Sequence, residues 1–237
     1  MKIISWNCNM AFRKKAGMML ALQPDLLIVQ ECEHPDKLSF PTEIASPDEM
    51  IWIGTNDNKG LGIFSYNGFK ISLHNKYDPE IRLVAPIKVS NGNSDFMLFA
   101  IWANSPGDPD GQYIGQVWKA LHHYDRLIKK HSTILIGDFN SNTIWDKPRR
   151  PFNHTTIVER LQQKGIDSLY HHHFKQAQGR EMHPTLYLYK HQDRPYHIDY
   201  CFASRDFTDK LEGVEIGDHA GWMKYSDHVP IIVSFSN

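Results

Sequence analysis

An apolar run that ends in polar residues, Thr133-Ile134-Leu135-Ile136-Gly137-Asp138-Phe139-Asn140-Ser141, sets the expected fold of this sequence. Its first five residues are predicted to form a short buried strand, because most of them are β-branched or apolar. Asp138 and Asn140 follow that strand directly. Taken alone, an Asp at this position is as typical of a turn or a helix cap as of a catalytic group. The ends of the other predicted strands therefore decide between a structural and a catalytic interpretation.

The same pattern, a polar side chain beside an apolar run, recurs along the chain. These polar residues are Asn7 and Asn9 after residues 2–6, Glu31 after 26–30, Asp199 within 197–203, and Asp227 and His228 before 231–235. Layered folds place their functional groups where strands end. Five such elements in one chain are hard to explain as unrelated turns, so they favour a functional site.

The remaining elements indicate a layered fold. Further strands are predicted at 50–53, 61–65, 70–74, 83–89, 96–102, 185–189 and 214–216, and helices at 11–22, 111–130 and 155–164. Mixed elements with more strands than helices favour an α/β or α+β class. Because no repeat, low-complexity tract or linker interrupts the pattern, we expect a single domain over residues 1–237.

Composition excludes several classes of protein. The chain has 41% hydrophobic and 22% charged residues, a globular balance that excludes disordered and fibrous proteins. Its net charge of −1 argues against a wholly basic surface for nucleic acid, although it allows a local basic patch. No apolar run is long enough to span a membrane, and the first residues lack the apolar core of a signal peptide. We therefore expect a cytoplasmic protein.

Cysteines and clustered histidines do not indicate a zinc site. Cys8, Cys32 and Cys201 are far apart and none has the spacing of a metal motif, so we expect free buried thiols. The run His171-His172-His173 resembles a ligand set, but adjacent residues of an extended segment point to opposite faces. We therefore interpret it as a surface or inter-layer segment.

Taken together, the strand-end motifs resemble a known superfamily. Ser5-Trp6-Asn7, Gln30-Glu31, Gly137-Asp138-Phe139-Asn140-Ser141, Ile198-Asp199-Tyr200 and Ser226-Asp227-His228 are similar, in this order, to the motifs of the endonuclease/exonuclease/phosphatase superfamily. The resemblance implies a four-layered α/β sandwich with two central mixed sheets flanked by helices. It also implies cleavage of a phosphate ester that depends on a divalent metal, Mg²⁺ or Mn²⁺, because hard oxygen donors suit these ions.

The resemblance also implies a role for each motif residue. Glu31 matches the metal-ligating glutamate, with Asn9 as a supporting amide and Asp227 as a further ligand or an orienting group. Asp138 matches the residue that orients or deprotonates the attacking water. The other matches are Asn7 and Asn140, which position phosphate and water, His228, which holds a phosphoryl oxygen, and its carboxylate partner Asp199.

One position departs from the pattern. Nucleases of the superfamily often carry Tyr or His after the strand that here covers 96–101, whereas this chain has Trp102-Ala103-Asn104. An indole N–H donates a hydrogen bond but cannot shuttle a proton. Trp102 therefore either packs between layers or contacts the substrate, and departure of the leaving group is assisted by a metal-bound water, Asn104 or another group.

Two basic or aromatic segments are candidates for substrate binding. Lys147, Arg149 and Arg150 follow the Asp138 loop and suit a phosphate backbone, or form a solvated surface loop. The predicted strand 185–189 alternates, so Tyr187 and Tyr189 share a face, and Arg194 follows them. Such aromatics either stack on unpaired bases or cover a sheet.

These observations favour a nuclease acting on DNA or RNA. The alternative is a phosphatase or phosphodiesterase on a phosphoinositide, a phospholipid head group or a small nucleotide. A non-catalytic binding module is disfavoured because every acidic motif residue is retained. We expect nucleic acid as the substrate, no obligate protein partner and a monomer. The sequence leaves open the endo or exo mode, strand polarity, lesion preference and the number of metal ions.

Overall fold

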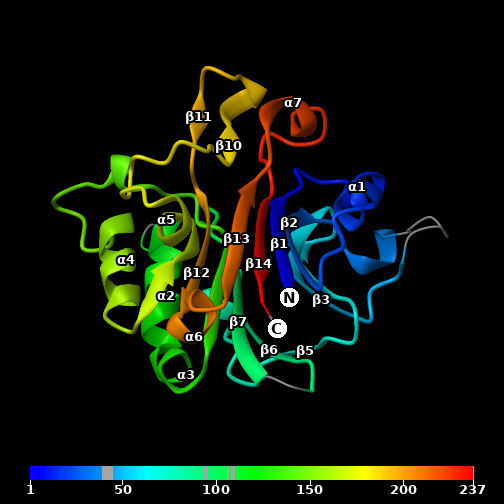
Figure 1. Cartoon of the computed structure of the whole chain (residues 1–237), viewed down its shortest axis with the longest axis horizontal. Coiled ribbons are helices and arrows are strands. Elements are labelled where there is room, and N and C mark those ends of the chain that lie inside the picture. The colour runs from blue at the N-terminus through cyan, green and yellow to red at the C-terminus, as the bar shows by residue number, and fades with distance from the viewer. Residues whose placement is uncertain (39–44, 93–94, 106, 108–109, 111, 237) are drawn as a thin grey trace.

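Two six-stranded β-sheets lie face to face at the centre of the molecule, and helices cover their outer faces (Figure 1). The computed structural model describes residues 1–38, 45–92, 95–105, 107, 110 and 112–236. The first sheet has the order β13 (Leu211–Ile216), β14 (Ile231–Phe235), β1 (Lys2–Asn7), β2 (Leu26–Cys32), β4 (Lys59–Ser65), β3 (Glu49–Asn56). The second has the order β5 (Lys70–Leu73), β6 (Val84–Ser90), β7 (Asp95–Trp102), β8 (Thr133–Asp138), β12 (Asp199–Ser204), β9 (Ile166–Ser168).

Short elements complete the fold. A two-stranded ribbon pairs β10 (Leu186–Tyr187) with β11 (Pro195–Tyr196). The α-helices are α1 (Ala16–Leu20), α2 (Ile114–His123), α3 (Asp125–Lys130), α4 (His154–Gln162), α5 (Leu169–Phe174), α6 (Arg205–Thr208) and α7 (His219–Trp222). The 3₁₀ turns are η1 (Phe12–Lys14), η2 (Pro35–Lys37), η3 (Pro79–Ile81), η5 (Thr143–Trp145) and η6 (Leu188–Lys190).

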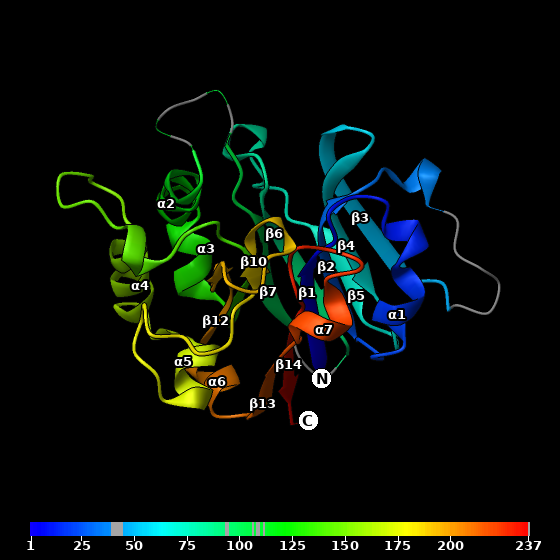
Figure 2. The same ribbon diagram turned by 90° about the horizontal axis from the view of Figure 1, so that it is seen from above.

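Alternating side chains build the four layers. In β8, Ile134 and Ile136 pack into the core between the two sheets, whereas Leu135 packs against the helices. This division follows from the pleat, because successive strand residues point to opposite faces. Helices α2, α3 and α4 cover the second sheet, while η1 and α1 cover the first (Figure 2). The predicted four-layered sandwich with two mixed sheets is confirmed.

The strands predicted from strongly apolar runs lie at the expected positions, whereas the helices and loops differ from the prediction. The helix predicted at 11–22 begins only at η1, because the three residues Asn9 to Ala11 have left-handed backbone angles that no α-helix continues. The helix predicted at 111–130 is broken at Tyr124, whose hydroxyl accepts a hydrogen bond from the Asp78 backbone N–H at 3.0 Å. Gly111 lies outside the described residues.

Two further expectations are wrong. The strand predicted at 185–189 ends at Tyr187, and the left-handed backbone of Tyr189 (φ 56°) then turns the chain back toward β11. The strict alternation expected there is therefore lost. The histidine run 171–173 is not extended but lies in α5, although His172 and His173 are exposed, as expected for a surface segment. Cys8, Cys32 and Cys201 are free and buried, as expected.

The two sheets approach each other closely at one edge. Gly137 has φ 146°, and a Cβ atom there would lie 1.9 Å from the carbonyl oxygen of Ile101. Opposite it, the buried Gln30 of the first sheet donates from Nε2 to that same carbonyl at 3.1 Å and to Ser5 Oγ at 3.0 Å. A glycine is required here because a side chain would collide with the backbone of the neighbouring strand β7 and would also crowd Gln30 Nε2 of the other sheet, 3.0 Å away. Within the described residues, no helix is long and apolar enough to cross a bilayer.

The substitution Gly137→Ala is expected to lower the free energy of unfolding by at least about 3 kcal/mol, since the methyl group meets backbone rather than a flexible side chain. Urea unfolding followed by circular dichroism measures this loss. Gly213→Ala is the matched control, because a Cβ there meets no atom within 4 Å, and it should change stability by less than about 1 kcal/mol. Equal effects of both substitutions would contradict the close approach.

Candidate functional site

Strand pairing brings the predicted site residues to one edge of the sandwich. Asp138 is the last residue of β8, opposite Asp199 in β12 and Trp102 in β7. In the first sheet, Asn7 ends β1 opposite Gln30 in β2, so Glu31 follows at the same edge. The two sets face each other across the gap between the sheets, because Asn7 reaches Asp138 directly.

Three groups fix the orientation of the buried Asp138 carboxylate. Its Oδ2 accepts hydrogen bonds from Asn7 Nδ2 at 3.1 Å and from Asn140 Nδ2 at 3.0 Å. Its Oδ1 accepts the backbone N–H of Asn140 at 2.9 Å. Asn140 adopts a left-handed backbone (φ 47°), and its Nδ2 also donates to the Ala103 carbonyl at 2.8 Å. The structure thus unites Asn7, Asp138 and Asn140 as the sequence motifs predicted.

Asp199 and His228 form the second half of the site. Nδ1 of His228 lies 2.9 Å from Asp199 Oδ2, and both side chains are buried. The backbone N–H of Asp199 is bound by Thr185 Oγ1 at 3.0 Å. Among the described residues, none forms a hydrogen bond with His228 Nε2, so this atom remains available to an incoming group. This arrangement suits donation from an imidazolium to a phosphoryl oxygen.

The site holds two carboxylates and one imidazole close together. Ligating atoms of Asp138, Asp199 and His228 all lie within 4.8 Å of one another. Burial and the nearby charge of Asp199 raise the pKa of Asp138 to about 7. Burial opposes the charged form of His228, yet Asp199, Asp138 and Asp227 together raise the pKa of His228 to about 10. A protonated His228 is therefore the counter-ion of the buried carboxylates at neutral pH.

A second group of oxygen donors lies around the end of β1. Asn9 Nδ2 donates to Asp227 Oδ1 at 3.3 Å, and the Asn9 N–H donates to Asn7 Oδ1 at 3.1 Å. Glu31 sits at a β-bulge with a left-handed backbone (φ 57°), which turns its side chain out of the regular pleat. Ser226 Oγ also stabilises this region, because it donates a hydrogen bond to the Asn7 carbonyl at 2.7 Å.

The donor chemistry of the site fits a hard divalent cation. Glu31, Asp227 and the Asn9 amide offer oxygen atoms, the ligands that Mg²⁺ and Mn²⁺ prefer. Asp199 Oδ1 is a buried carboxylate oxygen without a hydrogen-bond partner among the described residues. The Asp138, Asp199 and His228 group also has the spacing of a cation site, although an imidazolium at His228 suits an anion better.

Trp102 and Asn104 lie beside Asp138 but face different surroundings. Trp102 is buried in the core between the sheets, and Lys59 Nζ lies 5.8 Å from its ring centroid. The packing interpretation of Trp102 is thus consistent with its burial. Asn104 is half-buried, and its Oδ1 is buried without a partner among the described residues.

Among the other predicted substrate-binding residues, Tyr187 lies against this centre, because its backbone N–H donates to the Asp227 carbonyl at 2.8 Å. The loop that precedes α4 projects from the molecule (Figure 1). Lys147 and Arg149 are exposed on this loop, and the Arg150 guanidinium lies 4.4 Å from the Phe152 ring centroid. Tyr187 is buried against Met223 and Val229, whereas Tyr189 and Arg194 are exposed. Because the strand predicted there is interrupted, Tyr187 and Tyr189 do not form one aromatic face.

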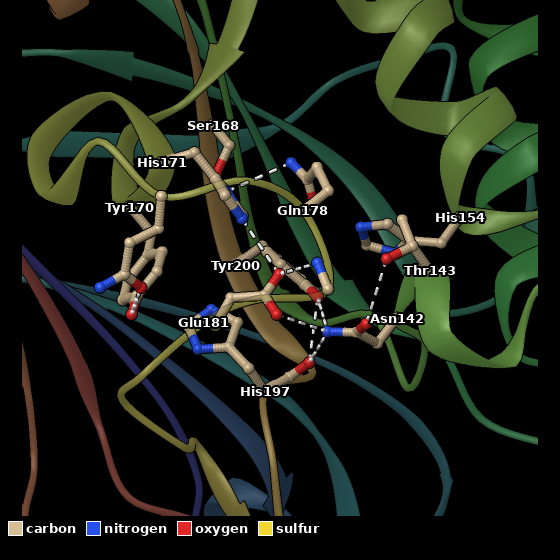
Figure 3. Close-up of polar contacts among 12 residues, drawn as sticks. Asn142, Thr143, His154, Ser168, Tyr170, His171, Gln178, Glu181, His197 and Tyr200 are labelled. Atoms are coloured by element: carbon tan, nitrogen blue, oxygen red, sulfur yellow. Dashed lines mark hydrogen bonds and ion pairs between the residues drawn. The ribbon is translucent and has the colours of Figure 1, made fainter.

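A buried polar network around Asn142, in the loop that follows β8, was not predicted from the sequence (Figure 3). Asn142 Nδ2 donates to Glu181 Oε2 at 3.1 Å, to the His197 carbonyl at 2.9 Å and to Tyr200 Oη at 3.0 Å. Glu181 also contacts His171 Nε2 at 3.0 Å. Burial opposes its charge, but hydrogen bonds from His171 and other donors lower the pKa of Glu181 to about 2. The sequence feature that points to this network is the amide side chain of Asn142, two residues after Asn140.

One edge of this network is a neutral histidine. His154, the first residue of α4, is fully buried, and its Nδ1 lies 2.8 Å from Ser141 Oγ. Burial lowers the pKa of His154 to about 4. The imidazole therefore packs in its neutral form beside Tyr200, with ring centroids 4.7 Å apart.

Comparisons with known proteins agree with the fold. The profile of the Endonuclease/Exonuclease/phosphatase family matches residues 4–228. The structure is similar to an AP endonuclease from Archaeoglobus fulgidus (TM-score 0.70, 16% identity), to the 3′ phosphatase NExo from Neisseria bound to a product DNA hairpin (0.68, 18%) and to an endonuclease/exonuclease/phosphatase family protein from Leptotrichia buccalis (0.65, 16%). Each alignment covers 100% of both chains. Comparison with curated proteins gives no match.

The buried neutral His154 predicts a loss of stability in acid. The unfolded chain binds a proton at this residue near pH 6.5, whereas the folded chain resists it until about pH 4. Lowering the pH from 6.5 to 4 therefore favours unfolding, by up to about 3 kcal/mol from this group. Denaturant unfolding across this range should show a shallower pH dependence in His154→Gln than in the wild type. The same substitution at the exposed His172 serves as the control and should retain the wild-type dependence.

Proposed function

Because this chain belongs to the endonuclease/exonuclease/phosphatase family, we propose that it is a nuclease that hydrolyses phosphodiester bonds in DNA or RNA with the aid of Mg²⁺ or Mn²⁺. The family and the fold support a metal-dependent phosphoric ester hydrolase. The observation that carries the proposal is the pair of hydrogen-bonded units, Asn7–Asp138–Asn140 and Asp199–His228, at one edge between the sheets. One unit accepts a proton and the other donates a hydrogen bond to an anion.

Asp138 is the group that handles the nucleophile. Its carboxylate is held in one orientation by Asn7 and Asn140, and a pKa near 7 makes it a competent base at neutral pH. It takes a proton from the attacking water as the water oxygen bonds to phosphorus and the ester P–O bond breaks, and the leaving oxygen takes up a proton from a solvent water. The amides of Asn7 and Asn140 occupy the other hydrogen-bonding directions of the Asp138 carboxylate. The direction that is left keeps the water in line with the phosphate.

His228 is the group that meets the developing charge. Asp199 fixes the ring through Nδ1 and favours the imidazolium, so Nε2 donates to a non-bridging phosphoryl oxygen. Glu31, Asn9 and Asp227 would hold the cation. When bound, a divalent cation neutralises charge on the scissile phosphate. Nucleic acid as the substrate is supported by the solved relatives named for an AP endonuclease and for a complex with a DNA hairpin.

A substrate panel tests the function. It comprises single-stranded DNA, duplex DNA with and without an abasic site, RNA, a phosphoinositide and bis(p-nitrophenyl) phosphate, each with Mg²⁺, Mn²⁺ or EDTA. Cleavage of at least one nucleic acid in the presence of metal supports the proposal. Hydrolysis of the phosphoinositide with no cleavage of nucleic acid would contradict it and favour the alternative phosphatase function.

Substitution of either half of the site should abolish most of the turnover. Asp138→Asn removes the base, and His228→Gln removes the imidazolium, so each is expected to lower kcat by a factor of about 10² to 10⁴ on the best substrate of the panel. Asp209→Asn, an exposed acid on the turn after α6, should leave kcat unchanged. Near-normal turnover of either site variant would contradict the proposed mechanism.

The cation requirement is tested separately at Glu31. EDTA should abolish activity, and added Mg²⁺ or Mn²⁺ should restore it. Glu31→Gln is expected to raise the Mg²⁺ concentration for half-maximal activity by about ten-fold or more and to reduce the rise in melting temperature that Mg²⁺ causes. Glu159→Gln, exposed on α4, is the control for loss of one negative charge. An unchanged Mg²⁺ requirement in Glu31→Gln would place the cation elsewhere.

A further inference from the structure

A pocket of about 430 Å³ adjoins the catalytic edge of the sandwich. Its walls come from the turn between β3 and β4, from the segment that precedes β6, and from the end of β7. Figure 2 shows the first two of these segments projecting on the same side of the molecule. The residues that matter for its chemistry are Asn56, Lys59, Tyr77, Arg82, Trp102 and Asn104.

The pocket is joined to the catalytic centre through backbone contacts. Trp102 pairs with Asp138 in the parallel β7–β8 ladder. The next residue, Ala103, donates its N–H to the Asp138 carbonyl at 2.8 Å and accepts Asn140 Nδ2 at 2.8 Å. The wall of the pocket is therefore fixed to the residues that handle the attacking water. The pocket therefore lies beside the place where Asp138 and His228 would hold a substrate.

The charge of the pocket is opposite to that of the catalytic centre. Lys59 and Arg82 are its only charged lining residues, and no carboxylate lines it among the described residues. Lys59 lies over the Trp102 ring, and neither Lys59 nor Arg82 forms an ion pair with a described residue. Both cations thus keep N–H donors for an anion.

The lining also contains an unsatisfied amide. Asn104 Oδ1 is buried without a hydrogen-bond partner, and its side-chain amide forms no bond with the described residues. Leaving a buried polar atom unpaired is costly, so such atoms mark places where a ligand or a water completes the site. Beside two unpaired cations, the Nδ2 group of Asn104 can donate to a phosphate oxygen, whereas Oδ1, an acceptor, is completed by a donor such as a water molecule.

We propose that this pocket binds the phosphate group that neighbours the scissile phosphate in the substrate, through Lys59, Arg82 and Asn104. The inference rests on the proposed function, because a neighbouring phosphate exists only in a substrate with more than one phosphate group. The pocket makes the enzyme prefer such substrates over isolated phosphodiesters. It also separates the two electrostatic tasks: the acidic edge performs the hydrolysis, and the basic pocket supplies binding energy.

Matched substrates isolate the contribution of the second phosphate. A thymidine dinucleotide with a single phosphodiester is compared with the same dinucleotide carrying one extra phosphate at its 5′ or its 3′ end. In the wild type, one of the two extra phosphates is expected to raise kcat/KM by about ten-fold, chiefly through KM. Lys59→Gln and Arg82→Gln should each lose most of that gain and should cleave the unmodified dinucleotide at the wild-type rate.

Controls separate the possible failures. Lys210→Gln, an exposed cation near the start of β13, should retain the whole gain, and thermal unfolding shows whether each variant is folded. For a longer oligonucleotide, each pocket variant should reduce the slope of log affinity against log salt by about 1. The pocket assignment is overturned if neither extra phosphate helps the wild type, if the variants keep the gain, or if they slow all dinucleotides equally. If the wild type cleaves no nucleotide substrate at all, the proposed function itself fails.

Discussion

The hydrogen bond from Asn7 to Asp138 joins the two sheets at the point where the candidate site is built. It is possible only because the sheets come together at this edge, where Gly137 lacks a side chain and Gln30 bonds the Ile101 carbonyl. Each sheet alone carries half of the functional groups. The separation of the sheets, rather than the conformation of any one loop, therefore determines the distance between the amide of one half and the carboxylate of the other.

Burial shifts the pKa values of the site residues and also makes their charged forms energetically unfavourable. Asp138 and Asp199 lie in a region where a lone carboxylate is unfavourable, and the imidazolium of His228 offsets their charge. The three residues therefore form one electrostatic unit, and the loss of any member leaves the others poorly compensated. The basic pocket at Lys59 and Arg82 lies beyond this unit, so it adds binding charge without disturbing the balance at the centre.

The sequence predicted the long apolar strands and the polar residues at their ends, because apolar runs show which residues are buried and where a strand stops. It did not predict the short strands β9 and β11. It could not predict Gln30 as a link between sheets, since a buried glutamine has no pattern of its own. The contact between Asn142 and Glu181 depends on two loops that are distant in sequence. The strand at 185–189 is shorter than predicted because two left-handed residues, Tyr189 and Lys190, follow a segment whose composition would otherwise continue it.

The position of β14 has a consequence for how the protein folds. This strand is near the end of the described chain, yet it inserts between β1 and β13, pairing Lys2 with Ser234. Such pairing requires closure of nearly the whole chain, which makes it a slow and late step. His228 lies shortly before β14, and Trp6 Nε1 of β1 donates to its carbonyl at 3.0 Å. Until β14 docks beside β1, His228 is not held next to Asp199 and Asp138, so catalytic competence depends on the docking of this strand.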